Sequence, residues 1–493
     1  MARLSNKTRL LQKIDACLFP GICTFFTCWH RLKQLFHKRD AATPPKSIIF
    51  LKLAEQGSTV LANEAIRQAV ACVGRENVFF LMFEENRFIL DVMDLIPREN
   101  VLTIPTKSAW TMATGCLARL LEIRRRKIEA CIDMEFFARS SAVICYLMHT
   151  RIRVGFHCYF GEGPHRGNLF THRVLYNSHI HASRTFLALV RALDNPPAQF
   201  PAFPYAPPAE ISLAHFQPTD AERAEVAAML RAAAAGGEGR AVSPKPPSGT
   251  VRSGGFGVSS EATGSATALP KVSDGGFGVS SEATGSATAL PITAGAAAPT
   301  VNCKPETVNS SSAATAPRLI LLNANASDLL PLRRWDNANY IVLARRLLET
   351  FPDAVIAFTG APSEQPKIAG LVAEIASPRC FSLAGKTTMR QLLILYGLAE
   401  ILVTNDSGPA HFAALTPVDV VVLFGPETPE LFGTLSPRNH AIWLGLACSP
   451  CINAWNNRQT ACRNNLCMKN ITVDQVFETV SNVYKQRAAA QST

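Results

Sequence analysis

The sequence predicts an α/β protein with two doubly wound, Rossmann-like domains, each a parallel sheet covered by helices. Short apolar, β-prone runs alternate with helix-like segments from about Ser47 to Gly155, and the alternation resumes at Arg318. This pattern is typical of βαβ units and therefore of parallel sheets. The chain has 493 residues, 47% of them hydrophobic, so it can bury more than one core.

We assign the first domain to residues 47–195 and the second to residues 318–493. The first should contain strands at 47–53, 78–83, 101–104, 129–133 and 151–156, and helices at 59–73, 88–95, 109–126 and 136–149. The second should contain strands at 318–323, 354–360, 380–385, 400–405 and 418–425, and helices at 338–350, 365–376, 389–399, 409–415 and 472–490. Two such domains should face a cleft with the carboxyl ends of their strands, where open parallel sheets bind ligands.

Residues 196–317 are rich in Pro, Ala, Gly, Ser and Thr and are helix-like only over 221–235. The block GGFGVSSEATGSATALP occurs at 254–270 and again, without a mismatch, at 275–291. Two copies of so polar a unit can bury almost nothing, so they do not predict a solenoid. We expect a disordered interdomain linker.

Residues 1–46 form a basic and apolar N-terminal arm. Its apolar run, Ala16 to Trp29, is shorter than the roughly 20 residues of a membrane-spanning helix and contains a Pro-Gly pair. A signal peptide would need a small-residue cleavage site after this run, and His30 to Lys33 is a poor one. A helix lying on the inner face of the membrane and a helix packed on the first domain remain equal alternatives.

Charge and cysteine usage narrow the class of function. Lys and Arg exceed Asp and Glu by 49 to 38, which suits anionic substrates or an anionic membrane surface, because no nucleic-acid-binding motif accompanies the charge. Ten of the 14 cysteines stand singly in apolar stretches, as expected of buried thiols in a reducing cytoplasm. We expect a cytoplasmic protein that can lie peripherally on the inner membrane.

A turn in the second domain has the chemistry of an anion site. An apolar strand ends at Thr404, the turn carries Asp406, Ser407 and Gly408, and Pro409 stands where a helix should begin. Free amides at a helix start bind phosphate, Gly408 would allow a pyrophosphate to approach the backbone, and Asp406 could cap the helix. The alternative for so short a motif is a capped helix without a ligand.

The residues around this turn resemble the most diagnostic segment of glycosyltransferase family 9, which includes the ADP-heptose:lipopolysaccharide heptosyltransferases. The pattern D-S/T-G-x-x-H-x-A, followed by F-G-P/A-T/E-x-P, is met by Asp406, Ser407, Gly408, His411, Ala413, Phe424, Gly425, Pro426, Glu427 and Pro429. The resemblance implies a GT-B fold and inverting transfer from a nucleotide-activated sugar, with no cofactor and no catalytic metal.

Two further donor contacts are implied by the resemblance. The family places a basic residue shortly before a Trp, which maps to Arg333 or Arg334 ahead of Trp335. An arginine facing the helix start would neutralise the leaving diphosphate, whereas the alternative is a solvated surface pair. Glu364 stands where the family contacts the nucleotide ribose.

The first domain resembles the family's opening strand, glycine turn and helix, with Gly57 as the turn glycine on the acceptor side. Family members usually place the proposed catalytic base, an Asp, directly after this glycine, and this chain has Ser58. A carboxylate must then come from elsewhere on the same sheet edge. The candidates are, in order, Glu55, Glu135 and Asp133; the alternatives are a solvated turn residue for Glu55 and a helix cap for Asp133.

Six of the 11 histidines lie between His149 and His181, together with Arg166 and Arg173. Such a loop could hold an anionic acceptor sugar, such as the acidic inner residue of a lipopolysaccharide core. It could equally be a surface loop without a ligand.

Four cysteines near the C-terminus are spaced as C-x2-C-x10-C-x4-C. The spacing is compatible with a tetrahedral zinc site, although the middle gap is longer than in most zinc ribbons. Packed free thiols or a disulfide are the favoured alternatives. These residues are Cys448, Cys451, Cys462 and Cys467.

Taken together, these features predict a metal-independent glycosyltransferase that moves a sugar, heptose being one candidate, from an ADP- or other nucleotide-activated donor to a lipopolysaccharide-type or other cell-surface glycan. One rival interpretation is a nucleotide-sugar-binding protein that has lost turnover, because position 58 lacks the aspartate. A more distant rival is a zinc-containing nucleic-acid-binding protein.

Overall fold

The computed structural model describes residues 13–36, 41, 43–197, 203, 205–206, 213–238, 317–326, 330–456 and 458–491. Residues 1–241 and 315–493 belong to one compact unit. The duplicated segments, and with them the expectation of a disordered linker, lie outside the described residues.

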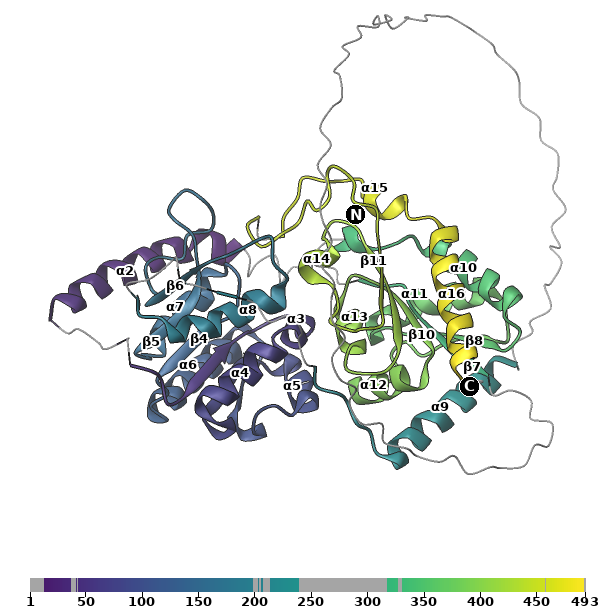
Figure 1. Ribbon diagram of the computed structural model, residues 1–493, viewed down its shortest axis with the longest axis horizontal. Coiled ribbons are helices and arrows are strands. Elements are labelled where there is room, and N and C mark those ends of the chain that lie inside the picture. The colour runs from purple at the N-terminus through teal and green to yellow at the C-terminus, as the bar shows by residue number, and fades with distance from the viewer. Residues whose placement is uncertain are drawn as a thin grey trace, which may run out of the picture. The chain divides into compact units, whose positions relative to one another are not determined.

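The predicted fold class is confirmed, because the described chain contains two six-stranded sheets whose paired strands all run parallel. The orders β3-β2-β1-β4-β5-β6 and β12-β11-β10-β7-β8-β9 are the same doubly wound pattern, starting from β1 and β7 (Figure 1). The strand order reverses beside the first strand of each sheet, and ligands of such sheets bind at that point.

The first sheet consists of β1 (Ile48–Leu51), β2 (Val78–Phe83), β3 (Val101–Ile104), β4 (Ala130–Asp133), β5 (Ile152–His157) and β6 (His172–Leu175). Its helices are α3 (Gln56–Leu61), α4 (Asn63–Val73), α5 (Phe88–Met93), α6 (Ala109–Arg125), α7 (Arg139–Leu147) and α8 (Ala182–Arg191). All four β1 side chains are fully buried, as expected of a central parallel strand covered on both faces.

The second sheet consists of β7 (Arg318–Asn323), β8 (Ala354–Phe358), β9 (Cys380–Ser382), β10 (Ile401–Asn405), β11 (Asp419–Phe424) and β12 (Asn439–Trp443). Its helices are α10 (Asn337–Thr350), α11 (Gln365–Ile375), α12 (Met389–Leu398), α13 (Gly408–Ala413), α14 (Pro429–Phe432), α15 (Leu466–Lys469) and α16 (Val473–Gln491). The last of these is the closing helix that the sequence predicts at 472–490.

Three sequence predictions need correction. The helix expected at 59–73 begins earlier, at Gln56, and is divided at Ala62 into α3 and α4. The segment from His149 to His181, described above as a loop, contains the predicted strand β5 and also an unpredicted strand, β6. Strand β12 was not predicted, because its sequence NHAIW is polar at one end and only partly buried at the edge of the sheet.

Two described helices lie outside the regions assigned to the domains. Helix α2 (Phe19–Phe36), in the N-terminal arm, packs on α7. Helix α9 (Asp220–Glu238), in the stretch assigned to the linker, packs on α12, where Arg390 Nη2 donates to Glu222 Oε2 over 3.1 Å. Among the described residues, no helix combines the length and the apolarity that crossing a membrane would require.

Candidate active site

The turn after β10 leads directly into α13, as the sequence predicts. Ser407 is the residue before the helix and Pro409 lies in its first turn. The expectation that Asp406 caps the helix is wrong, because no side chain makes a capping hydrogen bond there. Ser407 Oγ instead donates to the carbonyl of Asn405 over 3.0 Å. The first turn of α13 is therefore free of competition from side-chain caps.

Arg333 approaches this turn from the loop that follows β7. Its Nη1 lies 3.3 Å from Asp406 Oδ2 and 3.2 Å from Glu427 Oε2. The side chain of Arg334 instead donates to the carbonyl of Ala326 within its own loop, over 2.7 Å from Nη2. Of the two arginines that the sequence offered, the structure therefore brings Arg333 to Asp406.

The position of Arg333 follows from the tryptophan two residues later. The backbone N–H of Trp335 donates to Asn405 Oδ1 over 3.0 Å, and its indole Nε1 donates to the carbonyl of Ile471 over 2.8 Å. Because the ring is 1% exposed, both bonds are protected from water. The tryptophan thus anchors the arginine loop to the end of β10.

Several polar atoms around this turn have no hydrogen-bond partner among the described residues: Arg333 Nε, His411 Nδ1 and Asn325 Nδ2. Asn325 belongs to the same cluster, because its carbonyl accepts from Asn405 Nδ2 over 3.1 Å. Buried polar groups are normally paired, so a cluster of unpaired ones has the chemistry to bind a polar ligand.

Burial also sets the charges here. It lowers the pKa of His411 to about 4, so the imidazole is neutral at pH 7. It raises the pKa of Glu427 well above its usual value, and the neighbouring Asp406 raises it further. The positive charge available at this turn is therefore that of arginine rather than histidine.

On the first domain, the corresponding edge is formed by Glu55, Gly57 and Ser58. Glu55 precedes α3 with φ 70° and ψ 79°, a left-handed conformation that costs a non-glycine residue energy and that clusters at functional sites. Ser58 is buried, and its Oγ donates to the carbonyl of Glu55 over 2.8 Å. Its hydroxyl therefore supports the turn that holds Glu55.

Gly57 has no room for a side chain. A Cβ at this position would lie 2.6 Å from His411 Cδ2 and 3.4 Å from Gly408 Cα. Helix α3 and helix α13 accordingly make direct contact at their first turns. The glycine turns of the two domains therefore lie against each other.

A chain of ion pairs joins the two edges. Lys52, 1% exposed, lies 3.1 Å from Glu135 Oε2 and 3.6 Å from Glu55 Oε2. Glu55 is also paired with Arg458, whose Nε lies 3.6 Å from Glu427 Oε1. Sequence reasoning missed both Lys52 and Arg458. For Arg458 the reason is that a partner 403 residues away leaves no local signal.

The other two candidate bases have structural partners. Glu135 Oε1 accepts from the N–H groups of Leu53 and Ala54, at 2.8 and 3.2 Å. Asp133 is fully buried and is paired with Arg166. In this conformation Glu135 holds the chain after β1, and Asp133 belongs to the domain interior.

The residues expected on the acceptor side are dispersed. Arg166 is fully buried and donates from Nε and Nη1 to backbone carbonyls, among them that of Ala138 at 2.9 Å, so it braces the loop rather than presenting a charge. Arg173 is half-buried on β6. Burial lowers the pKa of His157 and His172 to about 4, so neither adds positive charge at neutral pH.

Glu364 lies beyond the carboxyl end of β8, where it accepts from the N–H of Ala361 over 2.7 Å. A Cβ at Gly360 would lie 3.0 Å from Glu364 Oε2 and 3.1 Å from Asn325 Nδ2. The carboxylate thus neighbours one of the unpaired polar atoms described above.

The C-terminal cysteines Cys448, Cys451, Cys462 and Cys467 are all free thiols. Burial, followed by the charges of the other three cysteines, raises the pKa of Cys467 to about 11. Within the described part of the chain, no group of three or more His, Cys, Asp or Glu side chains is arranged to hold a metal ion.

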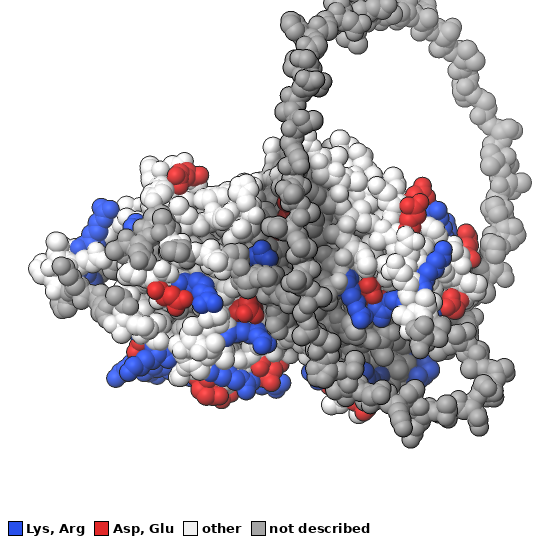
Figure 2. Space-filling model, in the orientation of Figure 1, with Lys and Arg blue, Asp and Glu red and all other residues white. Residues whose placement is uncertain are grey.

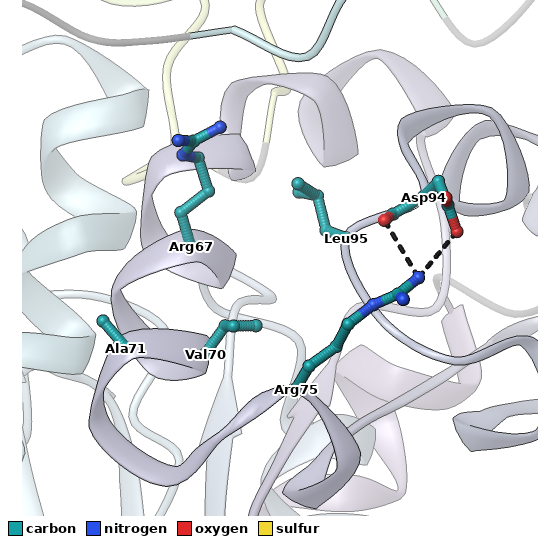
Figure 3. Close-up of a pocket in the computed structure, with 6 residues that line it drawn as sticks. All are labelled: Arg67, Val70, Ala71, Arg75, Asp94 and Leu95. Carbon is teal, nitrogen blue, oxygen red and sulfur yellow. Dashed lines mark hydrogen bonds and ion pairs between the residues drawn. The ribbon is translucent and has the colours of Figure 1, made fainter.

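A separate cavity of about 450 Å³ lies on the first domain, away from these residues. Figure 3 shows it between α4 and the segment after α5, lined by Arg67, Val70, Arg75, Asp94 and Leu95. Arg75 Nη2 lies 2.8 Å from Asp94 Oδ1, and both side chains are exposed. An exposed pair of this kind contributes little and does not define a ligand site.

A segment that includes most of the second domain matches a known family. The model of glycosyltransferase family 9 (heptosyltransferase) matches residues 293–461. This segment of the chain is similar to glycosyltransferase family 9. The resemblance seen around Asp406 to His411 is therefore confirmed, and the family 9 segment contains Arg333, the start of α13, Glu427 and Arg458.

Curated proteins with similar sequences are also heptosyltransferases, and each matches only part of this chain. Lipooligosaccharide heptosyltransferase 2 of Campylobacter jejuni is 27% identical over 177 residues, which are 34% of this chain and 51% of that protein. Lipopolysaccharide heptosyltransferase 2 of Salmonella typhimurium is 32% identical over 117 residues, 23% of this chain and 33% of that protein. The chain thus matches about half of the length of the first relative and a third of the second.

Solved structures extend the likeness to the fold. The Escherichia coli ADP-heptose lipopolysaccharide heptosyltransferase II has a TM-score of 0.55 at 15% identity, covering 90% of this chain and 99% of that one. A family 9 glycosyl transferase from Veillonella parvula has a TM-score of 0.55 at 14% identity, covering 91% and 100%. These comparisons confirm the GT-B-like architecture with two Rossmann-like domains.

Proposed function

We propose that this protein is an inverting glycosyltransferase that moves a sugar, heptose in particular, from a nucleotide-activated donor to a lipopolysaccharide-type glycan. The observation that carries the proposal is the family 9 turn Asp406 to His411 with Arg333 beside it and unpaired polar atoms around it. The similar proteins are named as lipooligosaccharide and lipopolysaccharide heptosyltransferases, one of them as an ADP-heptose enzyme, which supports ADP-heptose as the donor and a lipopolysaccharide-type acceptor.

The donor diphosphate would bind where Arg333 meets the first turn of α13. Arginine can pair with phosphate through two N–H groups, and its Nε is unpaired in the absence of a ligand. Helix amides and arginine would stabilise the charge that develops on the leaving diphosphate, without a catalytic metal. The neutral His411 can still donate one hydrogen bond, and Glu364 is the candidate for the ribose.

Glu55 is the proposed catalytic base. The acceptor hydroxyl oxygen would attack the anomeric carbon while its proton passes to the Glu55 carboxylate. The bond from the anomeric carbon to the diphosphate oxygen would break, and the nucleoside diphosphate would leave with the electron pair. The Glu55 carboxylate lies beside Lys52 and Arg458, and a general base must accept the hydroxyl proton on such a carboxylate. Gly57 and Ser58 would shape the acceptor side of the same turn.

The test compares two adjacent arginines. Arg333→Ala and Arg334→Ala remove the same charge from the same loop, but only Arg333 contacts Asp406 and Glu427. Sugar transfer should fall more than tenfold in Arg333→Ala and much less in Arg334→Ala. A saturating donor from a panel of nucleotide sugars should stabilise the wild-type protein by about 2–4 kcal/mol, and this stabilisation should decrease in Arg333→Ala.

The same assays distinguish the rival functions. A protein that is stabilised by a nucleotide sugar but transfers nothing to any glycan would be a binding protein. A protein that no nucleotide sugar stabilises, but that retains DNA or RNA in a salt-dependent manner, would contradict the glycosyltransferase proposal altogether.

A further inference from the structure

Helix α2 carries an apolar stripe on its solvent side. Successive members are spaced by 7, 4, 3 and 4 residues, so they form one line along the helix. Each of these side chains is between 44% and 76% exposed. Single exposed apolar side chains are normal on a protein surface, but a continuous line of them marks an interaction surface. The stripe consists of Phe25, Trp29, Leu32 and Phe36 in α2, together with Leu18 directly before the helix.

The opposite side of the helix is already occupied. The rings of Phe26 and His30 lie 5.3 and 5.5 Å from the ring of Tyr146 in α7. Cys23 is buried, and Thr27 Oγ1 accepts from the N–H of Asn168 over 3.0 Å. A surface helix normally turns a polar face to water, so a second apolar face calls for a second apolar environment.

Helix α6 carries a matching stripe. Trp110, Leu117 and Leu121 are spaced by 7 and 4 residues and are 77%, 58% and 42% exposed. The inner sides of α2, α6 and α7 share one core cluster on the same face of the first sheet, which includes Cys23 and Leu120. Because the three helices form one layer, the two stripes lie on the same outer face of the first domain.

The surroundings of both stripes are cationic. Residues 13–36 and 109–127 contain eight Lys or Arg and two Asp or Glu. Arg31 and Lys33 flank the α2 stripe, and Lys33 Nζ lies 5.2 Å from the centre of the Trp29 ring. In Figure 2 the left edge of the molecule, where Figure 1 places α2, is largely white with blue side chains beside it.

We propose that the outer face of α2 and α6 binds the surface of an anionic lipid bilayer, with α2 lying in the interfacial plane. Exposed Trp, Phe and Leu flanked by Lys and Arg are the composition that such helices use. A second copy of the chain is a poorer occupant, because it would bring two cationic faces together. This inference is independent of the proposed transferase activity.

The experiment uses the full chain and two kinds of lipid vesicle, pure phosphatidylcholine and phosphatidylcholine mixed with phosphatidylglycerol. We expect co-sedimentation with the mixed vesicles, weakening with salt, and a blue shift of tryptophan fluorescence. The triple variant Phe25→Gln, Trp29→Gln, Leu32→Gln should bind at least tenfold more weakly. The control Val342→Gln, an equally exposed apolar residue on the second domain, should bind like the wild type.

Circular dichroism and the thermal midpoint should be unchanged in the triple variant, because all three side chains are exposed. Failure of the wild-type chain to bind mixed vesicles, or undiminished binding of a folded triple variant, would overturn the proposal. Sedimentation velocity provides the remaining outcome: a wild-type dimer that the triple variant converts to monomer would assign this face to a second copy.

Discussion

The contact between α3 and α13 can be tested by adding one methyl group. In Gly57→Ala the new Cβ would lie 2.6 Å from His411 Cδ2, about 1 Å inside the normal carbon–carbon contact distance. The imidazole is 8% exposed and has little space to retreat. Overpacking of this kind costs about 1–3 kcal/mol.

A matched glycine provides the control. Gly370 lies within α11, and a Cβ there would meet nothing within 4 Å. Gly370→Ala should therefore stabilise the protein by about 1 kcal/mol, because alanine has the higher helix propensity. Both substitutions add one methyl group to a glycine. The difference between their free energies of unfolding therefore measures the clash with His411.

Urea denaturation of both variants, together with sugar transfer and donor-induced thermal shift, measures the outcome. We expect Gly57→Ala to unfold at lower urea than the wild type and to lose most of its donor response. If the domains relieve the clash by separating, stability will recover while the donor response stays lost. If instead Gly57→Ala has the same stability, transfer rate and donor-induced thermal shift as Gly370→Ala, then α3 and α13 do not meet at Gly57.

Further predictions concern the base, the protonation states, a buried ion pair and metal. Glu55→Gln should lower the transfer rate by roughly 10²–10⁴ with the donor-induced shift unchanged, and full activity would eliminate it as the base. His157, His172 and His411 have pKa values of about 4 when folded, below the unfolded value of 6.5. The unfolded chain therefore takes up protons first as pH falls, and each histidine should cost about 2 kcal/mol of stability between pH 6.5 and 5, measured by urea titration. Asp133→Asn would leave a buried arginine unpaired and should cost about 3–5 kcal/mol, whereas an unchanged thermal midpoint would contradict its buried role. Transfer should continue in excess chelator, and a chelator-sensitive rate would require a metal-assisted mechanism.

Local patterns in the sequence were sufficient to predict most strands of both sheets and the turn before α13. Buried parallel strands are short continuous apolar runs, and amphipathic helices have a period of about 3.6 residues, so β7, β8, β10 and β11 were predicted close to their observed positions. The turn at Asp406 to Pro409 was equally visible, because a strand end, a glycine and a proline follow one another directly. The edge strands β6 and β12 have the partly polar sequences HRVL and NHAIW instead of a continuous apolar run, and they were missed.

The site itself required the tertiary structure. The sequence by itself determined the fold class, the family 9 segment and a short set of candidate charges. Only the tertiary structure decided that Arg333 rather than Arg334 meets Asp406, and that Asp133 and Arg166 are buried against each other. Ion pairing depends on separations of a few ångströms between side chains that can be hundreds of residues apart in sequence. A short stretch of sequence carries no information about such distances. The pairing of Glu55 with Arg458 could therefore be found only in the tertiary structure.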